Sequence, residues 1–217
     1  MRVAATQLPL PTASPPRRRR RAQHMPTAAA PRPPPRALAA ILRSRVIACL
    51  RAEDGETALQ AAHAAVLGGV TVLEVVMSTP GVLEVIEDLC RSYPSLTFGE
   101  VLHDLEESKV LYIPGVLTPT EVLSACSAGA KVVKVYPVSV MGGEVYMSAL
   151  KKPFPLVPMV ASQGIQIGSI KGYVEAGASA VVLSDAIFDK ELMRKGKFSE
   201  ISEFASQATF EALQSTK

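Results

Sequence analysis

Lys131-Val-Val-Lys-Val-Tyr-Pro137 is the stretch from which the fold of this chain can be inferred. Four of its first six residues are β-branched or aromatic, and the proline ends the run. These features predict a short buried strand. Because strand side chains alternate between the two faces of a sheet, we expect one face to carry Val132, Lys134 and Tyr136.

Lys134 is unexpected in a strand that is covered on both faces, because burial disfavours the charged form of an amine. Lys131 begins the stretch and can reach water, whereas Lys134 lies three residues before the proline. Parallel α/β sheets and barrels place their ligand sites at this carboxyl end of the strands. A desolvated lysine there can serve as an amine nucleophile. A lysine can also extend its stem past the strand end into solvent, so the stretch alone leaves two interpretations open.

Strands and helices alternate through the rest of the chain, and the expected strands are apolar on both faces. Strands are predicted over residues 45–50, 70–77, 96–98, 110–113, 131–137, 156–161 and 178–183. Helices are predicted over residues 37–43, 56–67, 81–92, 101–107, 118–129, 143–150 and 167–176, with one or two more between 191 and 213. The alternation indicates a parallel sheet or a β/α barrel, although a closed barrel of this type has eight strands rather than seven.

The composition is that of one globular domain. The chain has 217 residues, of which 48% are hydrophobic, and it lacks the run of about 18 apolar residues that a membrane span needs. We therefore expect no membrane partner. The three cysteines, Cys49, Cys90 and Cys126, are far apart and lack metal-ligand spacing, which indicates reduced residues in an intracellular compartment and no metal site.

The net charge of +3 hides an asymmetry between the N-terminus and the rest of the chain. Residues 1–51 contain 11 arginines and no acid, since Glu53 is the first carboxylate. The remainder has 12 Lys and Arg against 20 acids, a balance of −8. An acidic body argues against nucleic acid as a partner.

Residues 1–35 form an Arg-, Pro- and Ala-rich leader that cannot bury enough apolar surface to fold, and residues 36–217 form the barrel domain. An acid-free, Arg-rich leader is typical of an organelle transit peptide, which predicts a chloroplast location. Two alternatives are a nuclear signal formed by Arg17–Arg21, and translation from Met25, which would leave a cytoplasmic protein.

Glu74 repeats the anomaly of Lys134, because it is the one carboxylate in the apolar strand Val70–Met77. An acid and a lysine at the ends of two buried parallel strands can meet across the top of the sheet. Such a pair can carry out proton transfer and nucleophilic attack, so Glu74 strengthens the functional interpretation of Lys134.

Four stretches, taken in order, resemble a known family. They are Leu73-Glu-Val-Val-Met-Ser-Thr-Pro80, Ile113-Pro-Gly-Val-Leu-Thr-Pro-Thr-Glu121, Val133-Lys-Val-Tyr-Pro137 followed by Gly142-Gly143, and Lys152-Pro-Phe-Pro155. Together they are similar to the 2-keto-3-deoxy-6-phosphogluconate (KDPG) and 4-hydroxy-2-oxoglutarate (KHG) aldolases in their plant-like form. The resemblance spans roughly residues 37–205.

The resemblance implies a (β/α)8 barrel that assembles as a homotrimer and a class I aldolase that needs no cofactor or metal. It implies that Lys134 forms a Schiff base with a 2-oxo acid and that Glu74 is the general acid/base. The products would be pyruvate and an aldehyde, either glyceraldehyde 3-phosphate or glyoxylate. The substrate-binding residues would be Ser78, Ser162, Gln163, Gly164 and Ser184.

Three departures from the family pattern bear on the substrate. Ser78 replaces an arginine that grips a substrate anion in bacterial relatives. Gln163 replaces a glycine of a Pro-Thr-Gly-Gly loop, and Ser184-Asp185 replaces a Gly-Ser phosphate site. Because Asp185 would repel a phosphate dianion, we expect a smaller, dicarboxylic or unphosphorylated 2-oxo acid.

The largest departure is a gap after Gly99. There the family has a further turn, helix and strand, on the order of thirty residues, and their absence accounts for the count of seven strands. An alternative splice form or an incorrect gene model would produce such a gap. An open barrel would expose two strand edges, so the alternative to an active aldolase is a truncated, catalytically impaired isoform that joins full-length subunits.

Overall fold

Seven parallel strands form one sheet in residues 35–99 and 111–215, the parts of the chain that the computed structural model describes. They are β1 (Val46–Leu50), β2 (Val72–Val75), β3 (Thr97–Gly99), β4 (Gly115–Val116), β5 (Val133–Val135), β6 (Met159–Ser162) and β7 (Ala180–Leu183). Their order across the sheet is β3-β2-β1-β7-β6-β5-β4. All the strand pairings in these parts of the chain are parallel, as expected when helices connect the strands.

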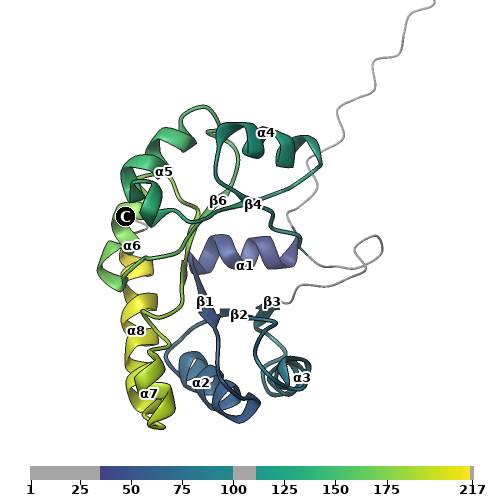
Figure 1. Ribbon diagram of the computed structural model, residues 1–217, viewed down its shortest axis with the longest axis vertical. Coiled ribbons are helices and arrows are strands. Elements are labelled where there is room, and N and C mark those ends of the chain that lie inside the picture. Colours follow the sequence, from purple (N-terminus) through teal and green to yellow (C-terminus); the bar gives the residue numbers. More distant parts are fainter. Residues whose placement is uncertain (1–34, 100–110, 216–217) are drawn as a thin grey trace, which may run out of the picture. The chain divides into compact units, whose positions relative to one another are not determined.

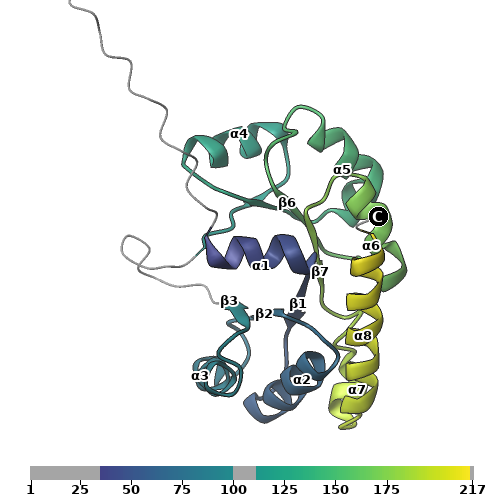
Figure 2. The same ribbon diagram turned by 180° about the vertical axis from the view of Figure 1, so that it is seen from behind.

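Helices connect and cover the strands (Figures 1 and 2). The α-helices are α1 (Arg36–Ser44), α2 (Gly55–Leu67), α3 (Val82–Ser92), α4 (Pro119–Ser127), α5 (Gly143–Lys151), α6 (Ile170–Glu175), α7 (Lys190–Arg194) and α8 (Phe198–Gln214). Two short 3-10 helices, η1 (Ser139–Met141) and η2 (Ile167–Ser169), follow β5 and β6. No helix within the described residues is long and apolar enough to cross a membrane.

The inner face of the sheet packs on α1. Strand residues on this face and the apolar side of α1 form one buried cluster, which contains Leu38, Ala40, Ile41, Ile47, Val72, Val132, Val160, Ala180 and Val182. In both ribbon views α1 lies between the strands of the two halves of the sheet (Figures 1 and 2). The helix therefore fills the space that the curved sheet encloses.

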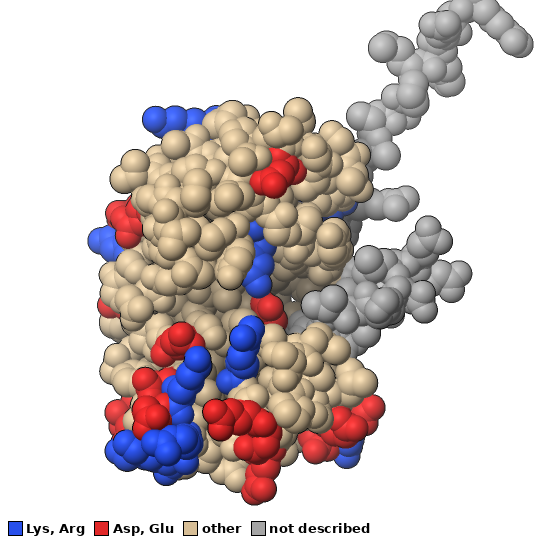
Figure 3. Space-filling view, viewed as in Figure 1, with Lys and Arg blue, Asp and Glu red and all other residues tan. Residues whose placement is uncertain are grey.

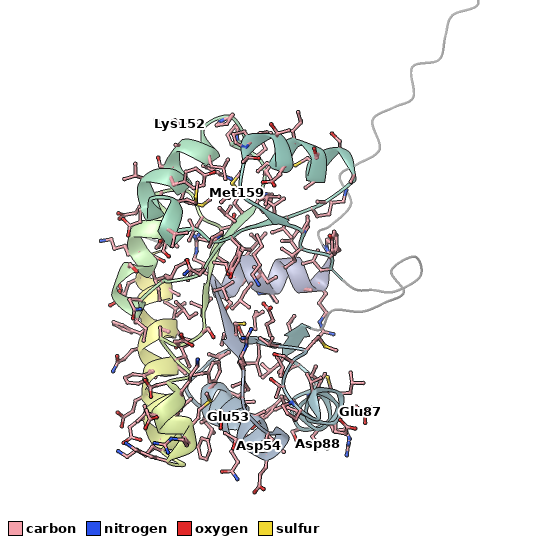
Figure 4. The ribbon with its side chains drawn as sticks, viewed as in Figure 1. Glu53, Asp54, Glu87, Asp88, Lys152 and Met159 are labelled. Carbon is pink, nitrogen blue, oxygen red and sulfur yellow. The ribbon has the colours of Figure 1, made fainter. Side chains whose placement is uncertain are left out.

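The outer face of the same strands packs on the connecting helices in a second, larger cluster. Alternate strand residues enter it, such as Ala48 on β1 and Val133 on β5. Met159, at the start of β6, is fully buried in this cluster (Figure 4). The predicted alternation along 131–137 is confirmed, because Val132 belongs to the inner cluster and Val133 to the outer one.

Side-chain caps fix the start of two of the connecting helices. The Asp54 carboxylate accepts a hydrogen bond from the Thr57 amide at 2.8 Å at the beginning of α2 (Figure 4). Thr118 and Glu121 form the predicted capping box at the start of α4. Each cap satisfies amide groups that the first helical turn leaves unpaired. The caps thus fix where α2 begins after β1 and where α4 begins after β4.

α2 and α8 approach each other closely at Gly68. A Cβ at this residue would lie 2.4 Å from the Ser202 carbonyl oxygen and 2.5 Å from the Ala205 Cβ. The absence of a side chain at residue 68 therefore lets the long C-terminal helix pack on the first connecting helix. Figure 3 shows that Lys, Arg, Asp and Glu side chains gather on the part of the visible face where Figure 1 labels α2, α3 and α7.

Most elements lie where the sequence predicts them, but one strand does not. Residues 111–113, assigned to a strand over 110–113, have no regular structure, and β4 comes two residues later at Gly115–Val116. The prediction was wrong because pairing with β5 decides where β4 lies: Gly115 pairs with Lys134 and Val116 with Val135. Leu111 and Ile113 instead pack against the inner cluster, which explains their apolar character.

The seven-strand count agrees with the expectation of a missing strand–helix unit. β3 and β4 are the two ends of the sheet, and the gap that we expect after Gly99 would fall between them. The helix predicted over 101–107 and most of the leader, residues 1–34, lie outside the described residues. The described architecture is that of a β/α barrel with one unit fewer than eight.

Candidate active site

Lys134 and Glu74 meet on the inner side of the sheet. The Nζ of Lys134, on β5, lies 3.3 Å from Oε1 and 3.2 Å from Oε2 of Glu74, on β2. Three strands, β1, β7 and β6, separate β2 from β5 in the sheet, so the contact crosses the enclosed space. The two side chains are 25% and 34% exposed, which leaves them accessible to a ligand while much of each is buried.

The strand pattern explains why both side chains point inward. Each is flanked along its strand by outer-face residues, Leu73 and Val75 beside Glu74, and Val133 and Val135 beside Lys134. Below them, toward the start of the strands, Val72 and Val132 fill the inner cluster. Lys134 and Glu74 thus lie above the inner apolar cluster, at the carboxyl ends of the strands.

Cys49 adjoins the pair and was not among the predicted site residues. It is the register partner of Glu74 on the neighbouring strand β1, and it packs against the inner cluster. Burial raises the pKa of the Cys49 thiol to about 12, and the negative charge of Glu74 adds to this effect. The thiol is therefore protonated near neutral pH, so it lines the site as a neutral group and does not act as a nucleophile.

Arg51 is a second residue that sequence reasoning missed. It follows β1 directly, and its positive charge reaches the site, since it acts to lower the pKa of the Cys49 thiol against the larger effect of burial. The Ala52 amide donates a hydrogen bond to the buried Thr79 hydroxyl at 3.4 Å. This bond joins the segment after β1 to the segment after β2, and so brings Arg51 and Ser78 into adjacent turns.

The predicted substrate-binding residues lie at the carboxyl ends of three strands. Ser78 is exposed in the turn after β2, and no hydrogen bond joins it to Lys134 or Glu74 in the described part of the chain. Ser162 ends β6 and is 4% exposed, and Gln163 and Gly164 follow it. Ser184 follows β7 and is half-buried.

The ends of β5, β6 and β7 are linked through their backbones. The Val138 amide donates to the Ser162 carbonyl oxygen at 3.0 Å, and Ser162 pairs in register with Val182. The Ser184 carbonyl oxygen accepts from the amides of Ile187 and Phe188. Ser162 therefore lies on the strand next to the one that carries Lys134, and Ser184 follows the strand after that.

A contact that the sequence did not suggest joins the loops after β5 and β6. The Ser139 hydroxyl donates to Oε1 of Gln163 at 2.5 Å. No group of three or more His, Cys, Asp or Glu side chains within the described ranges 35–99 and 111–215 is arranged to hold a metal ion. The site thus combines an amine and a carboxylate in contact with several neutral polar groups, and the exposed Arg51 lies in a neighbouring segment. These groups can form a covalent imine with a ketone, transfer protons and bind an anion.

Comparisons with known proteins agree with this chemistry. A family model described as KDPG and KHG aldolase matches residues 93–204, just over half of the chain. The 2-dehydro-3-deoxy-phosphogluconate aldolase of Treponema pallidum is 25% identical over 197 residues, which cover 77% of this chain and 93% of that protein. The KHG/KDPG aldolase of Escherichia coli K12 is 22% identical over 181 residues, which cover 70% of this chain and 85% of that protein.

The fold is also that of a solved aldolase structure. The KDPG aldolase of Legionella pneumophila, with pyruvate captured as a covalent carbinolamine intermediate, superposes with a TM-score of 0.70 at 23% identity. The match covers 79% of this chain and 97% of that one. The alignment with the Treponema protein is 197 positions long but covers only 77% of this chain, which is about 167 residues. This chain therefore has about 30 residues fewer than the aligned length. That shortfall is the size of one strand–helix unit.

Proposed function

Because the chain belongs to the KDPG and KHG aldolase family, we propose that it cleaves a 2-oxo-4-hydroxy acid reversibly to pyruvate and an aldehyde. The contact between Lys134 and Glu74 is the observation that carries the proposal. A primary amine within hydrogen-bond distance of a carboxylate, at the carboxyl ends of parallel strands, provides both groups that class I aldolase chemistry requires.

Lys134 acts as the nucleophile in this proposal. Glu74 accepts a proton from the ammonium group, which leaves a free amine. The amine attacks C2 of the substrate ketone, a C–N bond forms, and the carbonyl oxygen becomes the hydroxyl of a carbinolamine. Glu74 then protonates this hydroxyl, and water leaves as the iminium forms. The 3.2 Å contact allows one carboxylate to serve both proton transfers.

Cleavage uses the iminium of Lys134 as the electron acceptor. Glu74, directly or through a water molecule, removes the proton of the C4 hydroxyl, and the C3–C4 bond breaks. The aldehyde leaves, and the bonding electrons form the enamine of pyruvate. Protonation at C3 and hydrolysis of the iminium release pyruvate and restore the lysine. Each proton removed is returned within the cycle.

Arg51 is assigned to the substrate carboxylate. It supplies a guanidinium in the turn next to Ser78, the residue that replaces the arginine of bacterial relatives. A guanidinium suits a carboxylate because it can donate two parallel hydrogen bonds. We assign hydrogen bonds with the substrate oxygens to three serines, Ser78, Ser162 and Ser184. Gly164 lies in the loop that borders the site.

The test is pyruvate release from the two substrates that the relatives' names give, 4-hydroxy-2-oxoglutarate and 2-dehydro-3-deoxy-phosphogluconate. We expect release from at least one of them and its loss in Lys134→Met. Lys131→Met is the matched control, because Lys131 belongs to the same stretch but is exposed and lies outside β5. Release that persists in Lys134→Met, or absence of release from both substrates, would refute the proposal.

A second candidate function follows from the strand order, in which β3 and β4 are the two outermost strands of the sheet. An edge strand can pair with another chain. In this case the chain is a catalytically impaired subunit that joins full-length aldolase. Mixing the purified chain with a full-length relative and measuring the masses of the assemblies by light scattering distinguishes the two. Mixed assemblies without activity of the chain alone favour this candidate, whereas pyruvate release by the chain alone favours the first.

We also propose that the chain assembles as a homotrimer and is imported into chloroplasts. A homotrimer is the assembly that the family resemblance implies. The acid-free, Arg-rich residues 1–35 support a plant-like protein that is imported into chloroplasts. Sedimentation of the purified chain tests the trimer. Import of a fluorescent fusion, compared with a fusion that begins at Met25, tests the location, and the second fusion should stay in the cytoplasm.

A further inference from the structure

Gln163 bridges the loops that follow β5 and β6. The register pair of Lys134 with Val160 places Gln163 three residues further toward the carboxyl end of the neighbouring strand. Its Oε1 accepts the hydrogen bond from Ser139, which begins η1 after β5. The side chain of Gln163 is therefore held across the junction between the strand that carries the lysine and the next strand.

The backbone of Gln163 has a conformation that favours glycine. Its φ is 88°, and Arg45 is the other non-glycine residue with a positive φ in the described part of the chain. A residue with a side chain pays about 1 kcal/mol in this region, whereas glycine adopts it readily. A strained backbone conformation next to a candidate site is grounds for a functional hypothesis.

The following residue shows how closely this loop approaches Ser139. Gly164 also has a positive φ, 69°, and a Cβ there would lie 2.3 Å from the Ser139 hydroxyl oxygen. The loop after β6 thus packs directly on η1. The Gln163 side chain therefore lies at this junction of loops, at the position where the family pattern has a glycine without a side chain.

The loops after β6 and β7 carry no positive charge. Barrels often bind phosphate with the loops that follow their last two strands. In this chain these loops, residues 163–169 and 184–189, contain Asp185 and Asp189 but no lysine or arginine. The Ile187 and Phe188 amides are already hydrogen-bonded to the Ser184 carbonyl oxygen. The Asp189 carboxylate caps α7 by accepting a hydrogen bond from the Leu192 amide. A phosphate dianion at these loops would therefore be repelled by Asp185 without a compensating cation from either loop.

We propose that Gln163, oriented by Ser139, determines substrate specificity and restricts the site to short 2-oxo acids without a phosphate group. This inference rests on the proposed aldolase function. With Oε1 engaged by Ser139, the amide nitrogen of Gln163 is a neutral donor for a carboxylate or hydroxyl at the distal end of a short substrate. Its length takes the space that a glycine would leave to a longer chain.

The experiment compares kcat/KM for 4-hydroxy-2-oxoglutarate and for 2-dehydro-3-deoxy-phosphogluconate. We expect the wild type to favour the first by about tenfold or more, since a hydrogen-bonding site discriminates strongly against a substrate that cannot use it. Gln163→Gly should reduce this preference by about tenfold by admitting the longer substrate. A wild type that favours the phosphorylated substrate would overturn the inference without any variant.

Gln163→Glu is the sharper variant, because it keeps the length of the side chain and an acceptor for Ser139. It replaces the donor nitrogen by an oxygen and adds a negative charge, so kcat/KM for the dicarboxylate should fall more than in Gln163→Gly. Ser139→Ala leaves the backbone at Gln163 unaltered and should shift the preference in the same direction as Gln163→Gly. A purely structural role of the bridge would change both substrates equally.

The outcomes separate this inference from the function on which it rests. Pyruvate release from neither substrate by the wild type overturns both proposals. Release with the same preference in the wild type, Gln163→Gly, Gln163→Glu and Ser139→Ala overturns only the specificity inference. If a Gln163 variant fails to fold, Ser139→Ala and the wild-type preference still decide the question.

Discussion

The amine of Lys134 lies 3.2 Å from a carboxylate oxygen of Glu74, although 60 residues separate the two in the chain. The contact joins strands on opposite sides of the enclosed space, above an apolar layer that α1 fills. A lysine and a glutamate in this layer bring no packing advantage over apolar residues. Proton transfer between the two groups is the role that we propose for this contact.

Glu74→Gln should reduce kcat for pyruvate release by about 10²- to 10⁴-fold, the usual range for loss of a general acid/base. The amide keeps the shape of the side chain and can still contact Lys134, so the fold should be preserved. Steady-state kinetics and circular dichroism check both points. Glu84→Gln, at an exposed residue in the first turn of α3, is the control and should retain wild-type kcat. Comparable kcat in the two variants would remove Glu74 from the mechanism.

Arg51→Met should weaken binding of pyruvate and of the substrate by about tenfold or more, because a charge-assisted hydrogen bond to the substrate carboxylate is lost. The effect should fall on KM more than on kcat, since the carboxylate does not react. Arg51→Lys should restore part of the affinity by supplying a point charge.

Arg91→Met is the matched control for Arg51, because Arg91 is an exposed arginine on α3 whose guanidinium lies 2.8 Å from Asp88. Its KM should equal that of the wild type. If Arg51→Met and Arg91→Met leave KM equally unchanged, another group holds the substrate carboxylate.

Cys49 should make the stability of the protein sensitive to alkaline pH. The thiol has a pKa of about 12 in the folded protein, raised by burial from its ordinary value of 9.0. Below pH 9 both the folded and the unfolded states keep the proton, so the contribution to stability is complete. As the pH rises from 9 toward 12 the unfolded state loses the proton first, and the contribution is lost.

Denaturant unfolding at pH 8 and pH 10 measures this effect for the wild type and Cys49→Ala. The stability of the wild type should fall by about 1 kcal/mol more than that of Cys49→Ala over this interval. Cys126→Ala, at another half-buried cysteine, should show the wild-type decrease. A wild type and a Cys49→Ala variant with parallel pH profiles would show that the thiol is not desolvated as described.

Gly68→Ala should lower the free energy of unfolding by about 1–3 kcal/mol, because the new methyl group would overlap the backbone and side chain of α8. Gly68 has a negative φ of −74°, so the cost is one of packing and not of backbone strain. Gly168→Ala is the control, since nothing lies within 4 Å of its added Cβ, and it should change stability by less than about 0.5 kcal/mol. Equal stabilities of the two variants would contradict the packing of α2 on α8.

The architecture could be predicted because its determinants are local. Runs such as 45–50 and 178–183 are apolar on both faces, and glycines and caps separate them from amphipathic helices, so the alternation of strand and helix follows from the sequence. The strand expected over 110–113 was misplaced because β-propensity there reflects packing on the inner cluster. Which residues pair with β5 depends on a register that propensity does not encode.

The meeting of Lys134 and Glu74 was predictable for the same reason, whereas two other features of the candidate site were not. A lone charge in each of two apolar strands identifies Lys134 and Glu74. Cys49 resembles an ordinary apolar strand residue until the register places it opposite Glu74. The bridge from Ser139 to Gln163 depends on a left-handed backbone that a glutamine does not signal in sequence.

Reduction with borohydride in the presence of pyruvate tests the central claim most directly. The reductant converts an imine between pyruvate and a lysine into a stable secondary amine, which peptide mass spectrometry can assign to one residue. We expect a single adduct on Lys134 that is absent from Lys134→Met and retained in Lys131→Met. No adduct, or an adduct on another lysine, would contradict the assignment of Lys134 as the Schiff-base residue.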